Sequence, residues 1–179
     1  MKHMKEFTIP FVGLKQGEHH FEYKIDNTFF THFEYDEFNN VDVLAKALLI
    51  KKSNSLEFQF SINGIVNVNC DVTNEPYDQE VEGAHNLVVN FGDEYNDEDD
   101  TLLVIPQGTY EVNIQQYIYE LVILSLPVRR VHPGVEDGTL NSEILDKLKE
   151  LTPKETEEQS SKNEIDPRWD ELKKLLTDK

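Results

Sequence analysis

The stretch LEFQFSINGIVNVNCDVTNEPY, residues 56–77, decides the fold that the sequence predicts. Apolar and polar residues alternate on both sides of Asn63-Gly64, as in β-strands that bury one face. Asn-Gly between two alternating runs is the strongest short-range hairpin signal, because both central residues of a type I′ turn need a positive φ. We therefore predict a central hairpin that turns at Asn63-Gly64 and ends at Cys70, the only cysteine.

Alternation predicts further strands on either side of this hairpin. The predicted strands span 5–11, 19–25, 41–51, 77–81, 87–91 and 101–105. Residues 28–33 fit either a short strand or a turn of helix, and residues 41–51 also admit a helix. Because the strands come first and the helices follow, the fold class is α+β. We predict an antiparallel, strongly curved or barrel-like sheet built from the first ~110 residues.

The later part of the chain has helical periodicity. Residues 113–126 form an apolar helix that packs on the sheet, with Asn113 as its N-cap and Pro127 at its end. A second helix spans 143–151, capped by Asn141 or Ser142. Residues 152–165 are polar and form a flexible linker, and 166–179 form an amphipathic C-terminal helix. The predicted domain therefore covers residues 1–151.

Charge and composition narrow the function classes. The net charge is −18 and the pI is about 4.6, which disfavours extensive binding to nucleic acid and suits a basic protein partner. The alternative is that the charge only maintains solubility. A single cysteine rules out an intrachain disulfide, and no apolar run is long enough for a membrane span. The N-terminus lacks the apolar core of a signal peptide, so we expect a soluble, cytoplasmic protein.

Three stretches resemble the YceD-like family of bacterial and plastid proteins, in the variant common in Bacteroidetes. They are VNVNCDVTNEPYDQEVEG (66–83), QQYIYELVILSLPVRRVHPG (115–134) and IDPRWDELKKLLTDK (165–179). The first two resemble a family core in which a strand with Cys-x-x-Cys precedes a helix of this type. Thr73 stands at the position of the second family cysteine, and the loop 128–138 lacks a further one. No metal or redox role is therefore expected, and Cys70 is predicted to be a buried strand residue.

The resemblance implies a role in the accumulation of large-subunit ribosomal RNA. In the family this role is tied to a small basic protein of the large ribosomal subunit. We expect such a protein as the partner of this chain, with indirect or limited contact to the RNA. It implies no catalytic residues, so we expect a non-enzymatic factor without a cofactor. The residues alone leave two alternatives open, a metal-dependent hydrolase or nuclease and a small-molecule-binding barrel.

One local basic cluster stands out in the acidic chain. Arg129, Arg130 and His132 lie between Pro127 and Pro133, after the predicted helix. We single them out as partner-binding residues that contact an anion or RNA. The alternative is a solvated loop with internal salt bridges, which contribute only ~0–1 kcal/mol each.

The C-terminal segment is the other predicted binding element. Its apolar stripe consists of Trp169, Leu172, Leu175 and Leu176. An isolated helix of this length is marginal in water, so the stripe needs a surface, either the chain's own sheet or a groove on a partner. Basic residues on its polar face leave RNA and an acidic groove both open.

The histidines and the acidic loop 92–100 predict no specific metal site. His19 and His20 are adjacent in a predicted strand and point to opposite faces, and no His or Cys spacing fits a zinc motif. The loop 92–100 lacks the glycine and glutamate of a calcium-binding loop. We interpret it as a solvated loop, with weak cation binding as the alternative.

Overall fold

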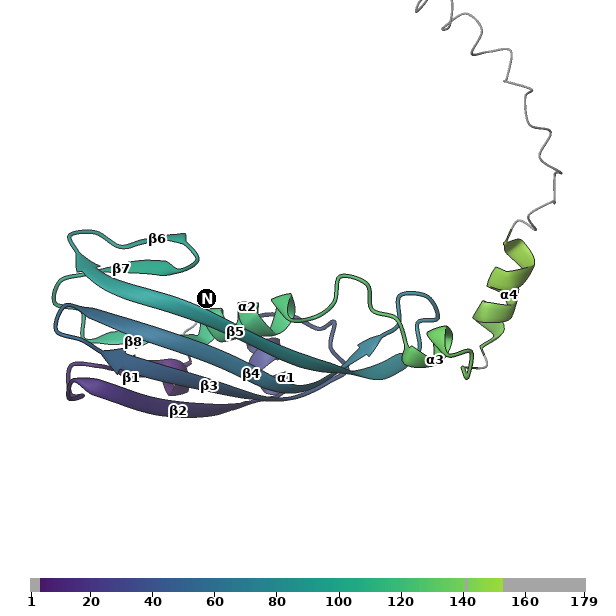
Figure 1. Ribbon diagram of the computed structural model, residues 1–179, viewed down its shortest axis with the longest axis horizontal. Coiled ribbons are helices and arrows are strands. Elements are labelled where there is room, and N and C mark those ends of the chain that lie inside the picture. The colour runs from purple at the N-terminus through teal and green to yellow at the C-terminus, as the bar shows by residue number, and fades with distance from the viewer. Residues whose placement is uncertain (1–3, 141, 153–179) are drawn as a thin grey trace, which may run out of the picture. The chain divides into compact units, whose positions relative to one another are not determined.

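The structure, a computed structural model, describes residues 4–140 and 142–152. Six strands form one sheet in the order β2-β3-β4-β5-β7-β6, and β1 pairs with β8 in a separate two-stranded sheet (Figure 1). The strands are β1 (Thr8–Pro10), β2 (Gly17–Ile25), β3 (Asn40–Lys51), β4 (Ser55–Asn69), β5 (Pro76–Gly92), β6 (Asn96–Asp99), β7 (Leu102–Pro106) and β8 (Glu111–Asn113).

Four short helices and a 3₁₀ turn complete the described fold. They are η1 (Lys5–Phe7), α1 (Asn27–His32), α2 (Gln115–Leu124), α3 (Pro133–Glu136) and α4 (Glu143–Leu151). Figure 1 shows α1 and α2 on the same face of the sheet. Helix α4 belongs to a separate compact unit that begins at Ser142.

The α+β class is confirmed, but the sheet is neither wholly antiparallel nor a closed barrel. Strand β7 runs parallel to β5, while the other neighbouring pairs are antiparallel. In the described part of the chain, β2 and β6 are the two edges of the sheet and do not pair with each other. The sheet therefore has one covered and one open face instead of an enclosed interior.

The predicted turn at Asn63-Gly64 is wrong, because β4 continues through it. Gly64 pairs with Val43 on one side and Val81 on the other, and it does not adopt a positive φ. A Cβ at position 64 would lie 2.3 Å from the backbone oxygen of Asp42. The glycine is required for the close approach of β3, which is the other reason for glycine inside a strand.

The chain actually reverses at Cys70–Glu75. The amide of Cys70 donates to the carbonyl of Glu75, the amide of Asn74 donates to the carbonyl of Cys70, and Asn74 has a φ of 59°. This turn joins β4 to β5, which is a single strand of 17 residues where the sequence predicted two. Gly83, between the two predicted runs, packs under Leu121 of α2 without ending the strand.

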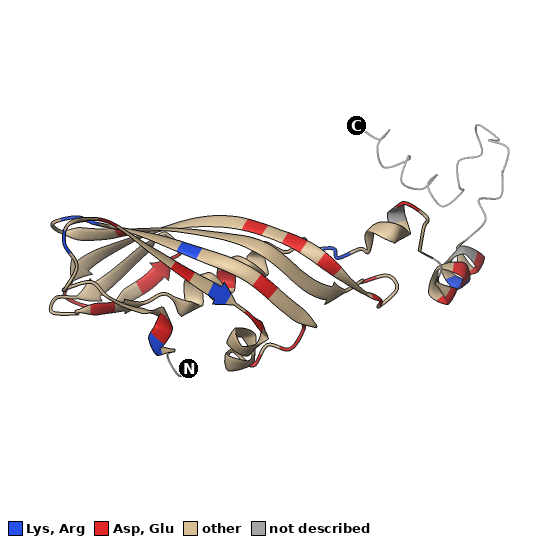
Figure 2. Cartoon of the chain, turned by 90° about the horizontal axis from the view of Figure 1, so that it is seen from below, with Lys and Arg blue, Asp and Glu red and all other residues tan. Residues whose placement is uncertain are grey.

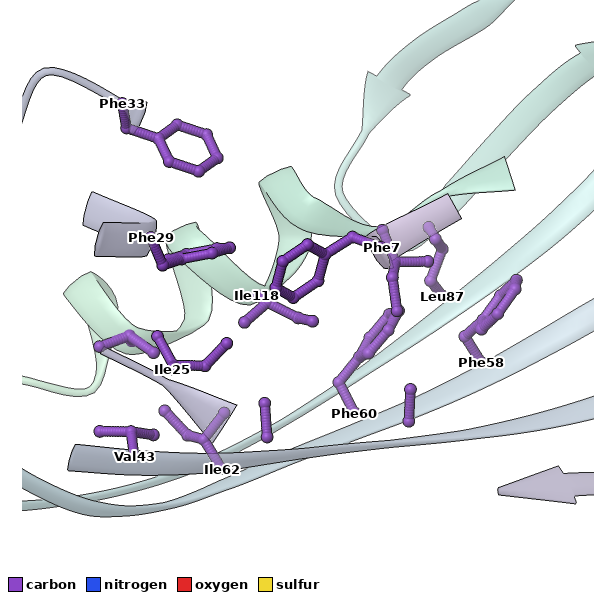
Figure 3. Close-up of a cluster of buried hydrophobic side chains, with 14 of the residues drawn as sticks. Phe7, Ile25, Phe29, Phe33, Val43, Phe58, Phe60, Ile62, Leu87 and Ile118 are labelled. Atoms are coloured by element: carbon purple, nitrogen blue, oxygen red, sulfur yellow. The ribbon is translucent and has the colours of Figure 1, made fainter. Parts of the chain in front are cut away.

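The core lies between the covered face of the sheet and the helices. Alternate residues of β4 (Leu56, Phe58, Phe60 and Ile62) are buried against Ile118 of α2 and the aromatic residues of α1 and η1. Figure 3 shows Phe60 and Ile62 pointing from the strands toward Ile118. At about 25 cal/mol per Å², each fully buried side chain of this size contributes roughly 1.5–3 kcal/mol.

Helix α2 forms as predicted within a residue or two at each end. The side chain of Asn113 accepts a hydrogen bond from the amide of Gln115 at 3.0 Å, although the N-cap position itself is Ile114. The buried Gln115 accepts from the amide of Met4 at 2.7 Å. These contacts hold the N-terminal segment against the start of α2, which fixes the helix relative to β1 and β8.

Other segments depart from prediction in detail. Residues 5–11 begin with η1 before β1, the acidic segment 92–100 contains β6, residues 128–138 contain α3, and residues 28–33 are helical as α1. Figure 2 shows more Asp and Glu than Lys and Arg on the strands. Among the described residues, no helix is long and apolar enough to cross a membrane.

Candidate functional site: an acidic groove beside helix α2

A groove of about 780 Å³ is lined by α2, the strands β6, β7 and β8, and one residue of β5. Its carboxylates are Asp97 and Asp99 of β6, Asp100 of the β6–β7 turn, Glu111 of β8 and Glu120 of α2. Its apolar residues are Leu103 and Ile105 of β7, Val112 of β8, and Leu121 and Leu124 of α2. We call this site the acidic groove.

Strand β6 and the β6–β7 turn, which together supply three of the carboxylates, are held by two sets of contacts. One oxygen of Asp99 accepts from the amide of Thr101 at 2.8 Å and from its hydroxyl at 2.7 Å. The ring Nε2 of His85, on β5, donates to the backbone oxygen of Asp100 at 2.9 Å. The turn is therefore tied to the central sheet, and its carboxylates have defined positions beside α2.

The carboxylates give the acidic groove a negative electrostatic potential. The hydrogen bonds from Thr101 hold the pKa of Asp99 below its usual value, so this carboxylate stays ionised at neutral pH. Burial, together with the neighbouring Tyr95, Asp97 and Glu120, raises the pKa of Tyr117 to about 12. A neutral phenol beside ionised carboxylates is the arrangement expected where the local potential disfavours further negative charge.

The acidic groove also offers apolar surface. Leu103, Ile105 and Val112 are buried at its base, whereas Leu124, at the end of α2, is 80% exposed. Tyr95 is 59% exposed, and its hydroxyl donates to Asp97 at 3.1 Å. One exposed leucine is ordinary on a protein surface, but here it adjoins a cavity that already has an apolar base.

This combination suits a ligand that is both cationic and apolar. Carboxylates attract Lys or Arg, and the apolar side chains gain free energy when a partner removes them from water. Within residues 4–140 and 142–152, no group of three or more His, Cys, Asp or Glu side chains is placed to hold a metal ion.

Comparison with protein families gives one match. The family model described as "Large ribosomal RNA subunit accumulation protein YceD" matches residues 58–176, which is most of the chain. The chain belongs to the YceD family. Comparison with curated proteins and with solved structures finds no match. The matched residues include every segment that lines the acidic groove.

In this YceD-family chain, the turn at Cys70 packs against the loop that follows α2. Cys70 is buried, as predicted, but it lies in the turn directly after β4 and not in a strand. Its sulfur accepts a hydrogen bond from the amide of His132 at 3.3 Å. Burial raises the pKa of the thiol, but hydrogen bonds from His132 and Thr73 outweigh burial and leave the pKa below its usual value. The Cys70 thiol therefore joins two parts of the family-matched region that are far apart in the sequence.

Arg130, predicted to bind a partner, is engaged within the fold. Its guanidinium lies 3.4 Å from Glu37 and 3.6 Å from Asp71. Its amide donates to Asp71 at 2.7 Å, and its carbonyl accepts from the amide of Asp71 at the same distance. Arg130 therefore has a structural role in joining the two loops, whether or not it also meets a partner.

The other residues of the basic cluster differ from Arg130. Arg129 is exposed, and so is available to a partner. The Nδ1 atom of His132 accepts from the amide of Gly134 at 2.9 Å, which caps α3, and the ring packs edge-on against Tyr77. The cluster and the acidic groove share no lining residue.

The remaining predicted residues, Trp169, Leu172, Leu175 and Leu176, lie outside the described residues. The acidic groove itself was missed, because its parts are far apart in the sequence. The segment 92–100 was interpreted as a solvated loop, and α2 as a packing element. The available signal was Leu124, an apolar residue near the end of the predicted helix 113–126.

Proposed function

We propose that this YceD-family protein supports the accumulation of large-subunit ribosomal RNA by binding a basic ribosomal protein, without chemistry of its own. The observation that carries the proposal is the acidic groove, whose carboxylates and apolar side chains complement a cationic protein segment. Membership of the family supports the link to large-subunit RNA.

Binding would proceed in two stages. The net charge of −18 attracts a basic protein from a distance and raises the rate of encounter. Screening shortens the range of this attraction from ~10 Å at 0.1 M salt to ~3 Å at 1 M. Contacts in the acidic groove then hold the partner. Held in this way, the basic protein would stay soluble until ribosomal RNA competes for it.

The two alternatives have less support. The described residues supply no metal-ligand cluster for a hydrolase, and the open sheet encloses no barrel interior for a small molecule. Direct RNA binding is opposed by the net charge, and the exposed Arg129 leaves room for only a limited contact.

Affinity purification from the source cells tests the proposal. The tagged full-length protein is recovered at low and at high salt, and bound proteins are identified by mass spectrometry. We expect large-subunit ribosomal proteins at low salt and less of them at high salt. In cells that lack the protein, we expect the ratio of large- to small-subunit RNA to fall. Recovery of no ribosomal protein, with an unchanged RNA ratio, would contradict the proposal.

A further inference from the structure

We infer that the acidic groove binds a peptide segment in which an apolar anchor side chain is flanked by Lys or Arg. The inference rests on the proposed function, since it describes the part of the basic partner that enters this site. It adds the requirement for an apolar side chain among the basic residues, because a requirement for positive charge alone would be satisfied by any polybasic chain.

The lining of the groove carries the first step. Its carboxylates come from β6, the β6–β7 turn, β8 and α2, and its apolar side chains from β7, β8 and α2. Because β8 and α2 each supply both kinds, a segment that binds along either element meets carboxylates and apolar side chains together. Lys or Arg side chains pair with Asp97 or Glu120, and an apolar side chain covers Leu124.

The competing occupants fit less well. A polybasic segment without an anchor leaves the apolar surface in water and loses that part of the free energy. RNA would bring negatively charged phosphates next to the carboxylates of the acidic groove, which repel them. A second copy of this chain carries a net charge of −18, so like charges would meet at the rim. Charge complementarity together with the apolar base therefore selects a basic segment with an anchor.

Binding of two synthetic peptides to the full-length protein tests the pattern. One peptide is lysine-rich with central leucines, and the other has serine in place of each leucine. Burial of one leucine-sized side chain predicts that the leucine peptide binds at least about tenfold more tightly. Equal affinities in calorimetry would overturn the inference.

Variants of the protein test the location. The rim variant combines Asp97→Lys, Asp100→Lys and Glu120→Lys, and the control combines Glu18→Lys, Glu80→Lys and Glu82→Lys. All six residues are exposed, and both variants change the net charge equally. We expect the rim variant to lose binding of the leucine peptide while the control keeps most of it. Equal losses would show that no specific groove is involved.

A second pair of variants tests the apolar contact without changing charge. Leu124→Ser removes the exposed leucine of the groove, and Val12→Ser removes an exposed valine that does not line it. We expect Leu124→Ser to weaken the leucine peptide severalfold and to leave the serine peptide unchanged. Val12→Ser should affect neither peptide. Tighter binding of single-stranded RNA than of the leucine peptide would overturn the inference.

Failure of the inference is distinguishable from failure of the proposed function. If the rim variant still recovers ribosomal proteins from cells at wild-type levels, the partner binds elsewhere and only the inference fails. If the leucine peptide binds the groove but no ribosomal protein is recovered, the inference stands for a different basic partner and the proposed function fails.

Discussion

The amide of His132 donates a hydrogen bond to the sulfur of Cys70, 62 residues earlier in the chain. This bond joins the β4–β5 turn to the loop after α2, and the contacts between Asp71 and Arg130 run beside it. Removing the thiol leaves the amide of His132 without this buried acceptor.

Cys70→Ala should therefore lower the free energy of unfolding by about 1–3 kcal/mol, the cost of an unsatisfied buried donor. Cys70→Ser retains an acceptor and should cost less. The thiol pKa is lowered in the fold, so the stability of wild type relative to Cys70→Ser should rise with pH between that pKa and the ordinary value of 9.0. Urea denaturation across this pH range measures both effects, and a flat difference would contradict the second.

Gly64→Ala should destabilise the protein because the new Cβ would collide with the backbone of β3. Overpacking of this kind costs typically about 1–3 kcal/mol. Gly13→Ala is the matched control, since nothing lies within 4 Å of its added Cβ and it has no positive φ. Equal denaturation midpoints for Gly64→Ala and Gly13→Ala would contradict the close approach of β3 to Gly64.

His85→Phe should loosen the wall of the acidic groove. Phenylalanine can retain the ring packing against Tyr117 but cannot donate to the carbonyl of Asp100. We expect faster amide hydrogen exchange in β6 and the β6–β7 turn, with exchange in β3 and β4 unchanged. His20→Phe, at an exposed position of β2, is the control. Unchanged exchange in β6 would show that the hydrogen bond does not hold the turn.

Charge reversal separates the two arginines of the basic cluster. Arg130→Glu places a third carboxylate beside Glu37 and Asp71, and should lower the thermal midpoint, whereas Arg129→Glu should not. If the cluster binds a partner, the single substitution Arg129→Glu should reduce co-sedimentation with ribosomal particles. Unchanged co-sedimentation would remove Arg129 from the binding surface.

Removal of residues 152–179 tests the predicted role of the C-terminal segment. We expect the truncated protein to keep its fold and its thermal midpoint but to bind its partner more weakly. Circular dichroism and the affinity purification described above measure the two properties. A large fall in the midpoint would mean that this segment contributes to the core.

Local patterns in the sequence predict most of the strands and helices but not where the chain turns between them. Strands β2, β3 and β7 and helices α2 and α4 follow from periodicity, because each buries one face or stripe. The turn predicted at Asn63-Gly64 is wrong because the Asn-Gly dipeptide favours a turn, whereas the spacing of the buried residues on its two sides does not. Buried positions are even-numbered on both sides, from Leu56 to Cys70, which fits one continuous strand; a two-residue turn would have shifted them to odd numbers.

The acidic groove could not be predicted in the same way. It requires β6 and its turn to lie beside α2, and this depends on β7 pairing in parallel with β5 after a reversal through β6. No periodicity in the segment 92–100 signals that pairing, since all four residues of β6 are exposed. Long-range strand order is a property of the whole sheet, whereas the alternation of residues is local.

Strand β6 has one more consequence. It ends the sheet with four residues, Asn96–Asp99, of which three are acidic. An unpaired strand edge is a template for assembly into aggregates, and charged residues on a short edge oppose such growth. The same carboxylates that we assign to peptide binding would also keep neighbouring copies from polymerising through their sheets.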